Sequence, residues 1–306
     1  MWKSVSGDEG HRFRVRLLHW FSTHGRDLPW RGTSNPYRIL ISETMLQQTQ
    51  VSRIRATYST FLRTFPSLRS LARARQRDVV VAWRGLGYNN RAVRLHRLAQ
   101  NVCTIHGGKI PDTFDDLVAL PGIGKYTANA LLSLASGAHV PVVDVNVRRF
   151  LSRVFWTMRS TGVVRGEKEI WQLAATLLPR GKTDTWNQAL MDVGATVCTA
   201  RRPRCSQCPA AILCRSRTFM QRSTPPRPKH EPSLSGVPNR LYRGRIVEAL
   251  RHRSRVHESE LGMLIYQHYS RKNERWLHAL LADLQRDGLI SVQRNGSRRN
   301  SVVALV

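Results

Sequence analysis

The stretch from Leu120 to Leu151 places the strongest constraint on the fold of this chain. It opens with a tight Leu-Pro-Gly-Ile-Gly turn and continues into an apolar segment, which predicts a helix from about Tyr126 to Ala135. The glycines of the turn, Gly122 and Gly124, let backbone N–H groups at a helix N-terminus point toward an anion such as a phosphate. The alternative is a plain tight turn with no ligand.

A single carboxylate, Asp144, follows this helix inside a valine-rich segment, residues 140–145. Apolar surroundings can shift the pKa of such a group toward a value useful in catalysis. A phosphate-binding turn beside this acid indicates that a DNA backbone is held while chemistry takes place on a nucleotide. The alternative for Asp144 is a structural one, a helix N-cap ahead of residues 146–149.

The charge of the chain favours a polyanionic partner. It carries 49 Lys+Arg against 20 Asp+Glu, a formal net charge of +29 over 306 residues. Such an excess favours nucleic acid, because counterions released from the phosphates drive binding. Arginine use imposed by a GC-rich genome is an alternative, but it does not explain the whole imbalance. The 41% hydrophobic content is that of a folded protein, long enough for two or three domains.

Four of the five cysteines lie between residues 198 and 214 in a C-x6-C-x2-C-x5-C series. No run of about 18 apolar residues predicts a membrane helix, and the first 18 residues lack an apolar signal core. We therefore expect no membrane association and a cytoplasmic location, on the nucleoid if the source is bacterial. In a reducing compartment, clustered thiols indicate metal rather than disulfides, and this spacing suits either zinc or a [4Fe–4S] cluster. The expected ligands are Cys198, Cys205, Cys208 and Cys214.

The organisation along the chain predicts an all-α protein with a small α+β tail. Helical periodicity dominates residues 1–222, and a proline-rich segment at 223–239 predicts a linker. Residues 240–306 predict three helices followed by two strands around Asn295-Gly296, a winged-helix-like pattern. The three tail helices are expected at residues 241–251, 257–269 and 274–286.

Several motifs occur in an order that resembles a known family. They are SETMLQQTQV, GLGY, LPGIGKYTANA, VVDVNV, WNQALMDVGATVC and the four-cysteine loop, spread over residues 10–220. Together they resemble the helix-hairpin-helix DNA glycosylases, and within these the MutY branch of adenine DNA glycosylases. The resemblance implies an all-helical, two-lobed glycosylase domain over residues 1–222 that binds DNA across its lobes. It also implies a [4Fe–4S] cluster rather than zinc.

The resemblance assigns the chemistry to three residues. Glu43 matches the general acid that protonates the flipped purine, a role that needs a raised pKa in a closed pocket. Asp144 matches the acid beside the sugar, where opposite charge steadies the cation formed as the base leaves. Asn146 matches the residue that orients the sugar and the attacking water. The structural alternatives are a solvated helix glutamate for Glu43 and a local cap for Asn146.

Position 126 distinguishes two kinds of chemistry within this family. Endonuclease III-like relatives place there a lysine whose amine attacks the sugar, whereas this chain has Tyr126, and a phenol forms no Schiff base. The resemblance therefore implies a monofunctional glycosylase without strong AP lyase activity, in which Tyr126 is a fourth catalytic residue that hydrogen-bonds near Asp144. The neighbouring Lys125 is interpreted as a phosphate contact.

Other positions match the DNA-binding parts of the family. Gln48 and Tyr88 match the wedge that fills the stack vacated by a flipped base, although Tyr88 could be an ordinary packed aromatic. Gly122 and Gly124 match the phosphate-binding hairpin. Asn89 and Asn90 depart from the family pattern beside the wedge. The residues that match the adenine-pocket loop are Arg26, Leu28, Trp30 and Arg31, and Arg31 is also a candidate phosphate contact.

The expected substrate is double-stranded DNA, from which a monomeric enzyme removes adenine mispaired with guanine or 8-oxoguanine. The tail lacks the character of the Nudix-like domain that inspects 8-oxoguanine in MutY enzymes, which leaves the opposite base open. A mismatch thymine or uracil glycosylase on the same scaffold is one alternative. A non-catalytic DNA-binding regulator is another, and the presence of both Glu43 and Asp144 disfavours it.

Overall fold

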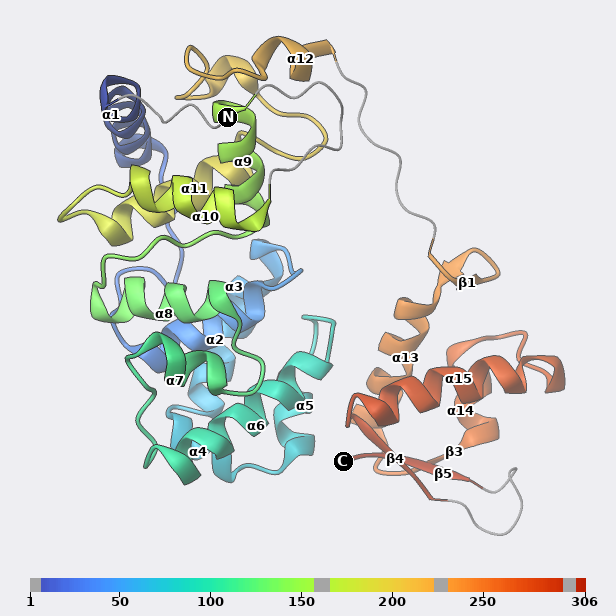
Figure 1. Cartoon of the computed structure of the whole chain (residues 1–306). Coiled ribbons are helices and arrows are strands. Elements are labelled where there is room, and N and C mark those ends of the chain that lie inside the picture. Colours follow the sequence, from blue (N-terminus) through green and yellow to red (C-terminus); the bar gives the residue numbers. More distant parts are fainter. Residues whose placement is uncertain (1–6, 157–165, 223–230, 294–300) are drawn as a thin grey trace. The chain divides into compact units, whose positions relative to one another are not determined.

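The computed structural model describes residues 7–156, 166–222, 231–293 and 301–306 (Figure 1). The described chain is mostly helical, as predicted, with a small sheet near its C-terminal end. It divides into two compact units. Unit 1 comprises Met1–Ile39, Asp112–Val118 and Ile123–Pro228, and unit 2 comprises Leu40–Pro111, Ala119–Gly122 and Lys229–Val306. None of the described helices is both long and apolar enough to span a membrane.

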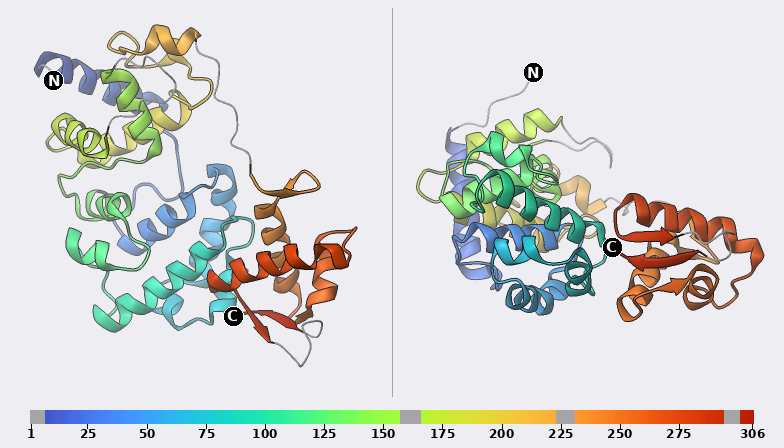
Figure 2. Two further views of the ribbon diagram at one scale, coloured as in Figure 1. Left: turned by 45° about the vertical axis from the view of Figure 1, so that its right-hand side comes forward. Right: turned by 90° about the horizontal axis from the view of Figure 1, so that it is seen from below.

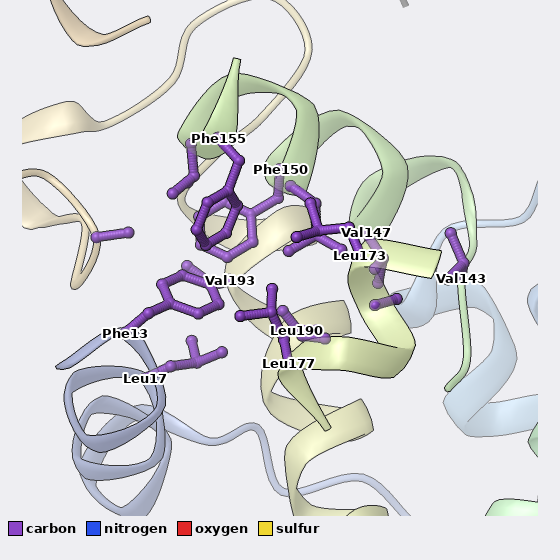
Figure 3. Close-up of a cluster of buried hydrophobic side chains, with 14 of the residues drawn as sticks. Phe13, Leu17, Val143, Val147, Phe150, Phe155, Leu173, Leu177, Leu190 and Val193 are labelled. Atoms are coloured by element: carbon purple, nitrogen blue, oxygen red, sulfur yellow. The ribbon is translucent and has the colours of Figure 1, made fainter. Parts of the chain in front are cut away.

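The helices of unit 1 enclose a hydrophobic core (Figure 3). Helix α9 shows why this core forms, because Val147, Phe150, Leu151 and Val154 recur at helical spacing on one buried face. Phe13 of α1 meets this face, with its ring 5.9 Å from that of Phe150. The helices of unit 1 are α1 (Gly7–His24), α8 (Lys125–Ser136), α9 (Val145–Phe155), α10 (Glu167–Leu177), α11 (Thr183–Thr196) and α12 (Arg217–Arg222), with a 3-10 turn η1 at Cys205–Gln207.

Helix α2 (Pro36–Leu46) crosses from unit 1 into unit 2 and carries Glu43. Its start is set locally: the side-chain oxygen of Asn35 accepts hydrogen bonds from the backbone N–H groups of Tyr37 and Arg38, which leaves Pro36 at the first helical position. The other helices of the first part of unit 2 are α3 (Val51–Thr64), α4 (Leu68–Arg73), α5 (Gln76–Ala82) and α6 (Asn90–Ile105), and α6 packs on α4 and α5.

The turn predicted between two helices is present. Helix α7 (Phe114–Ala119) precedes it and α8 follows, so the segment is a helix-hairpin-helix. Gly122 has a φ of 85°, a left-handed backbone that favours glycine, whereas Gly124 is the N-cap of α8 with an ordinary φ of −104°. Only the first glycine is therefore required by backbone conformation.

The C-terminal part of unit 2 combines three helices with a three-stranded antiparallel sheet, and Figure 2 shows α15 beside that sheet. The sheet order is β3-β5-β4, with Ile290 of β4 opposite Leu305 of β5. The elements are α13 (Asn239–His252), β3 (Val256–His257), α14 (Glu258–Ile265), the 3-10 turn η2 (Arg271–Asn273), α15 (Glu274–Arg286), β4 (Ile290–Gln293) and β5 (Val302–Leu305).

This part differs from the sequence prediction in three details. The second tail helix, α14, ends at Ile265 instead of Tyr269, and β3 was not predicted. A two-stranded hairpin, β1 (Ser233–Leu234) with β2 (Val237–Pro238), lies in the segment interpreted as a linker. The predicted Asn295-Gly296 turn falls outside the described residues.

Candidate active site and DNA interface

Asp144 is the N-cap of α9 in unit 1. Its Oδ1 accepts hydrogen bonds from the backbone N–H groups of Asn146 at 2.9 Å and Val147 at 2.7 Å, and its Oδ2 accepts one from Asn146 Nδ2 at 2.7 Å. Asp144 therefore caps α9, as the structural alternative predicted, and this function is compatible with a catalytic role. The side chain is only half-buried, and these hydrogen bonds hold its carboxyl group at the start of α9.

Asn146 links Asp144 to a partly buried arginine, Arg149, that the sequence prediction missed. Arg149 Nη2 donates to Asn146 Oδ1 at 2.9 Å and to the carbonyl of Gly194 at 2.7 Å, and its Nε donates to the carbonyl of Cys198 at 2.8 Å. Burial lowers the pKa of Arg149 from its usual value. Through Asn146 and Arg149, the turn that contains Asp144 is thus connected to α11 and to Cys198, the first cysteine of the loop.

Helix α11 approaches this turn closely because position 194 has no side chain. A Cβ on Gly194 would lie 2.8 Å from the carbonyl oxygen of Asn146, closer than non-bonded atoms pack. The close approach also sets the distance at which Arg149 reaches the carbonyl of Gly194. Gly194 therefore fixes the separation between α11 and the start of α9.

The segment from Arg26 to Arg31 is held by a second buried acid, Asp192 of α11. Arg26 donates to Asp192 from its backbone N–H at 2.9 Å and from its Nε at 2.8 Å, and Arg31 donates through both terminal nitrogens at 3.0 and 2.6 Å. Arg26 and Arg31 were predicted to face the base or the phosphate, and the structure places their guanidinium groups on Asp192. Leu28 and Trp30 of the same segment are buried.

Asp192 was not predicted as a site residue. Its side chain is fully buried, which by itself raises the pKa, but the hydrogen bonds from Arg31 and Arg26 outweigh burial and hold the pKa of Asp192 below its usual value. The available sequence signal was a lone acid within the apolar run Ala189–Val193. That signal does not reveal its partners, which lie more than 160 residues earlier.

Tyr126 and Lys125 lie at the start of α8. The hydroxyl of Tyr126 is 3.7 Å from Met191 Sδ, and its side chain is half-buried. Lys125 is exposed, and its Nζ lies 4.2 Å from the ring centroid of Trp171, a cation–π contact. The amine next to Tyr126 in the sequence is therefore held on an indole ring of α10.

Glu43 of unit 2 is 4% exposed, between the buried residues Ser42 and Thr44 of α2. A solvated surface glutamate, the alternative considered from the sequence, does not fit this burial. The carboxyl group of Glu43 therefore lies in the interior of unit 2, away from bulk solvent. Glu43 belongs to unit 2, whereas Asp144 belongs to unit 1.

Gln48 and Tyr88 are exposed in unit 2, in the turns that follow α2 and α5. Tyr88 is 48% exposed, which excludes the alternative of a packed core aromatic. Both have left-handed backbones, with φ values of 56° and 42°. A residue other than glycine held in this region costs roughly 1–3 kcal/mol, and such strain concentrates at functional sites.

The predicted metal ligands Cys198, Cys205, Cys208 and Cys214 line one pocket beside the core of unit 1. Within the described ranges, no three Cys, His, Asp or Glu side chains converge closely enough for a single metal ion. The pocket is nevertheless suited to an anionic group, because Arg153 lines it, donates to Cys198 Sγ at 3.4 Å, and has a buried Nε without a hydrogen-bond partner among the described residues. Burial raises the pKa of the Cys208 thiol to about 12 and that of Cys214 to about 11.

Asn89, which departs from the family pattern in the sequence, contacts the C-terminal part of unit 2. Arg251 of α13 donates to Asn89 Oδ1 at 2.8 Å and to the carbonyl of Val80 at 3.0 Å. Asn89 thus serves as a contact for the C-terminal part. A cavity of about 520 Å³ is lined by Gln48 and Tyr88 together with Arg240 and Arg243 of α13.

Comparison with known proteins identifies the family of the chain. Residues 41–176 match the HhH-GPD superfamily base excision DNA repair protein family. The chain is 39% identical over 249 residues to an adenine DNA glycosylase of Mycobacterium tuberculosis (strain CDC 1551 / Oshkosh), covering 81% of each chain. It is 40% identical over 236 residues to the human adenine DNA glycosylase, covering 74% of this chain and 43% of the human protein. A thermostable thymine-DNA glycosylase structure aligns with a TM-score of 0.62 and 31% identity, covering 68% of this chain and 98% of that one.

The chain therefore belongs to the HhH-GPD superfamily of base excision DNA repair proteins. Within that superfamily it falls in the MutY-type branch, where its curated relatives carry the name adenine DNA glycosylase. The resemblance inferred from the sequence motifs is confirmed at this level.

Proposed function

We propose that this chain is a monofunctional DNA glycosylase that hydrolyses the N-glycosidic bond of an adenine mispaired with guanine or 8-oxoguanine. The observation that carries the proposal is Asp144, whose carboxylate is fixed by three neutral N–H donors while remaining half-buried. The adenine DNA glycosylases to which the chain is similar support adenine as the base. The buried position of Glu43 supports its proposed role as the acid that protonates the leaving base.

In the proposed reaction, Glu43 gives a proton to the purine of the flipped nucleotide, which turns the base into a better leaving group. The ionised carboxylate of Asp144 stabilises the positive charge that develops on the sugar. Asn146 orients the attacking water through its amide. Tyr126 supplies no amine, and the amine of Lys125 lies against Trp171, so strand cleavage through a Schiff base is not expected.

The four cysteines are proposed to hold a [4Fe–4S] cluster. All four line one pocket of unit 1, where their thiolates would supply the four ligands that such a cluster takes. The Nε of Arg153, which has no hydrogen-bond partner among the described residues, supplies a donor toward an anionic group in that pocket. The role proposed for the cluster is structural: it orders the basic loop at residues 201–204 for contact with DNA. Anaerobically purified protein should be brown with a broad visible absorption band, and colourless protein would argue against the cluster.

The C-terminal part is proposed to be a winged-helix-like domain that contacts DNA. Its element order, α13-β3-α14-α15-β4-β5, is that of a helical unit closed by a three-stranded sheet. Arg240 and Arg243 line the cavity that also contains Gln48 and Tyr88. Cationic side chains beside the wedge suit the phosphates that flank an extruded nucleotide.

A mismatch thymine glycosylase is the second candidate, favoured by the likeness to the thymine-DNA glycosylase structure. The two are distinguished by single-turnover excision on duplexes with adenine, thymine, uracil or hypoxanthine opposite guanine or 8-oxoguanine. Release of adenine with little release of thymine supports the proposal, and release of thymine or uracil alone supports the second candidate. Glu43→Gln is the control, because loss of the proton donor should slow adenine release by about 10²–10⁴-fold.

A further inference from the structure

Arg91, at the start of α6, connects three segments of unit 2 that the sequence holds apart. Its Nη1 donates to the carbonyls of Thr44, Met45 and Gln47 at 2.8, 2.9 and 2.5 Å. Thr44 and Met45 are at the C-terminal end of α2, where helix carbonyls lack intrahelical partners. Arg91 therefore caps the helix that carries Glu43.

The same guanidinium also holds the two turns that carry Gln48 and Tyr88. Its Nη2 donates to Thr49 Oγ1 at 2.8 Å and to the carbonyls of Leu86 and Gly87, both at 3.2 Å. The Arg91 Cζ lies 5.8 Å from the ring centroid of Tyr88, within cation–π range. Thr49 completes the connection, because its hydroxyl donates to the carbonyl of Leu86 at 3.1 Å.

Burying the charge of Arg91 at this position costs free energy, which the hydrogen bonds described above offset. The side chain is buried, at 6% exposure, and burial lowers its pKa to about 10, so the group stays charged at neutral pH. The positive charge also lies in the first turn of a helix, where the dipole opposes it. Its acceptors are neutral carbonyls and one hydroxyl, which fix geometry rather than neutralise charge.

We propose that Arg91 is a positioning residue that holds Gln48 and Tyr88 in their left-handed backbone conformations, ready to enter the base stack, and fixes them relative to the helix of Glu43. This inference rests on the proposed function. Without the guanidinium, the strained turns relax toward ordinary backbone conformations and the wedge must be ordered during each flipping event. The loss should appear in excision from a paired duplex, because extrusion requires the wedge.

A double-mutant cycle in the full chain tests this coupling. Arg91→Lys retains the charge and loses the planar fork, so single-turnover release of adenine from an adenine–guanine duplex should fall at least tenfold. In a Gln48→Ala, Tyr88→Ala background, where both wedge side chains are already gone, the same substitution should slow release less than twofold further. Arg63→Lys, an exposed arginine on α3, is the matched control and should change neither rate.

The outcomes separate the possible roles. Rate losses that multiply when Arg91→Lys is combined with the wedge substitutions would show that Arg91 acts independently of the wedge and would overturn the inference. If Arg91→Lys does not fold, Thr49→Val replaces it in the cycle, with an expected two- to fivefold loss that again vanishes in the Gln48→Ala, Tyr88→Ala background. A wild-type chain that releases no adenine from any duplex would overturn the proposed function and this inference with it. An active wild type with multiplying losses overturns the inference alone.

Discussion

Two carboxylates of unit 1 occupy contrasting surroundings. Asp192 is fully buried and accepts hydrogen bonds from two guanidinium groups, whereas Asp144 is half-buried and accepts them from neutral N–H groups. A carboxylate that is already paired with two guanidinium groups has little net charge with which to stabilise another cation. One fixed by neutral donors is held in a defined position without a cation hydrogen-bonded to it, as stabilisation of a cationic sugar requires. The type of partner, more than the depth of burial, distinguishes the candidate catalytic acid from the structural one.

Asp144→Asn tests the catalytic side of this comparison and should have the largest effect. Asparagine is also a good N-cap, so α9 should keep its start while the negative charge is lost. We expect the single-turnover rate of adenine release to fall by about 10³-fold or more. The dissociation constant for the same duplex and the melting temperature serve as controls, and both should change little. An unchanged rate would remove Asp144 from the mechanism.

Asp192→Asn tests the structural side. It leaves Arg26 and Arg31 without their counter-charge, and both guanidinium groups are partly exposed, at 27% and 17%. We therefore expect a loss of roughly 2–3 kcal/mol in the free energy of unfolding, below the roughly 3–5 kcal/mol found when a fully buried pair is broken. Denaturant titration measures it. Asp184→Asn, an exposed acid on the same helix, is the matched control and should stay within about 0.5 kcal/mol of the wild type.

The contribution of Asp192 should also depend on pH. Its pKa in the folded state lies below its usual value, so the stability it provides is fully present above the unfolded pKa of about 3.9 and is lost as pH falls through the folded pKa. The difference in unfolding free energy between wild type and Asp192→Asn should be constant from about pH 5 to 8 and shrink below about pH 4. A difference that grows on acidification would show that the arginines do not hold the carboxylate ionised.

Lys125→Met should have the smallest effect, because an exposed cation on an indole ring contributes only about 0.5–1 kcal/mol. If Lys125 also contacts a phosphate, the slope of log affinity against log salt should decrease by about 1. Fluorescence anisotropy over a salt series measures this slope. An unchanged slope would leave only the contact with Trp171.

The sequence predicted the elements whose pattern is local. Helix α15 was expected at residues 274–286 and is found there, because its leucines repeat on one face. The two-residue strand β3 was missed, since nothing in Val256 and His257 distinguishes a strand before they pair with β5. Helix α14 ends four residues before the predicted end, because the spacing of apolar residues does not show where a helix stops.

Residues of the candidate site could be proposed from the sequence where they belong to a motif. They could not be proposed where their role depends on contacts between distant parts of the chain. Glu43 and Asp144 were proposed through their motifs, and their catalytic roles stay predictions. The contacts of Asp192 and Arg91 were missed because they depend on groups far along the chain. Arg26 and Arg31 show the converse problem. Their residue type suits phosphate, and only the structure reveals an internal acid that engages them.

The bare backbone at Gly194 has a practical consequence. Adding one methyl group there would meet the carbonyl oxygen of Asn146 at 2.8 Å, and the turn that presents Asp144 would have to retreat. A substitution at position 194 should therefore displace the carboxylate of Asp144 while leaving every polar group around it chemically intact.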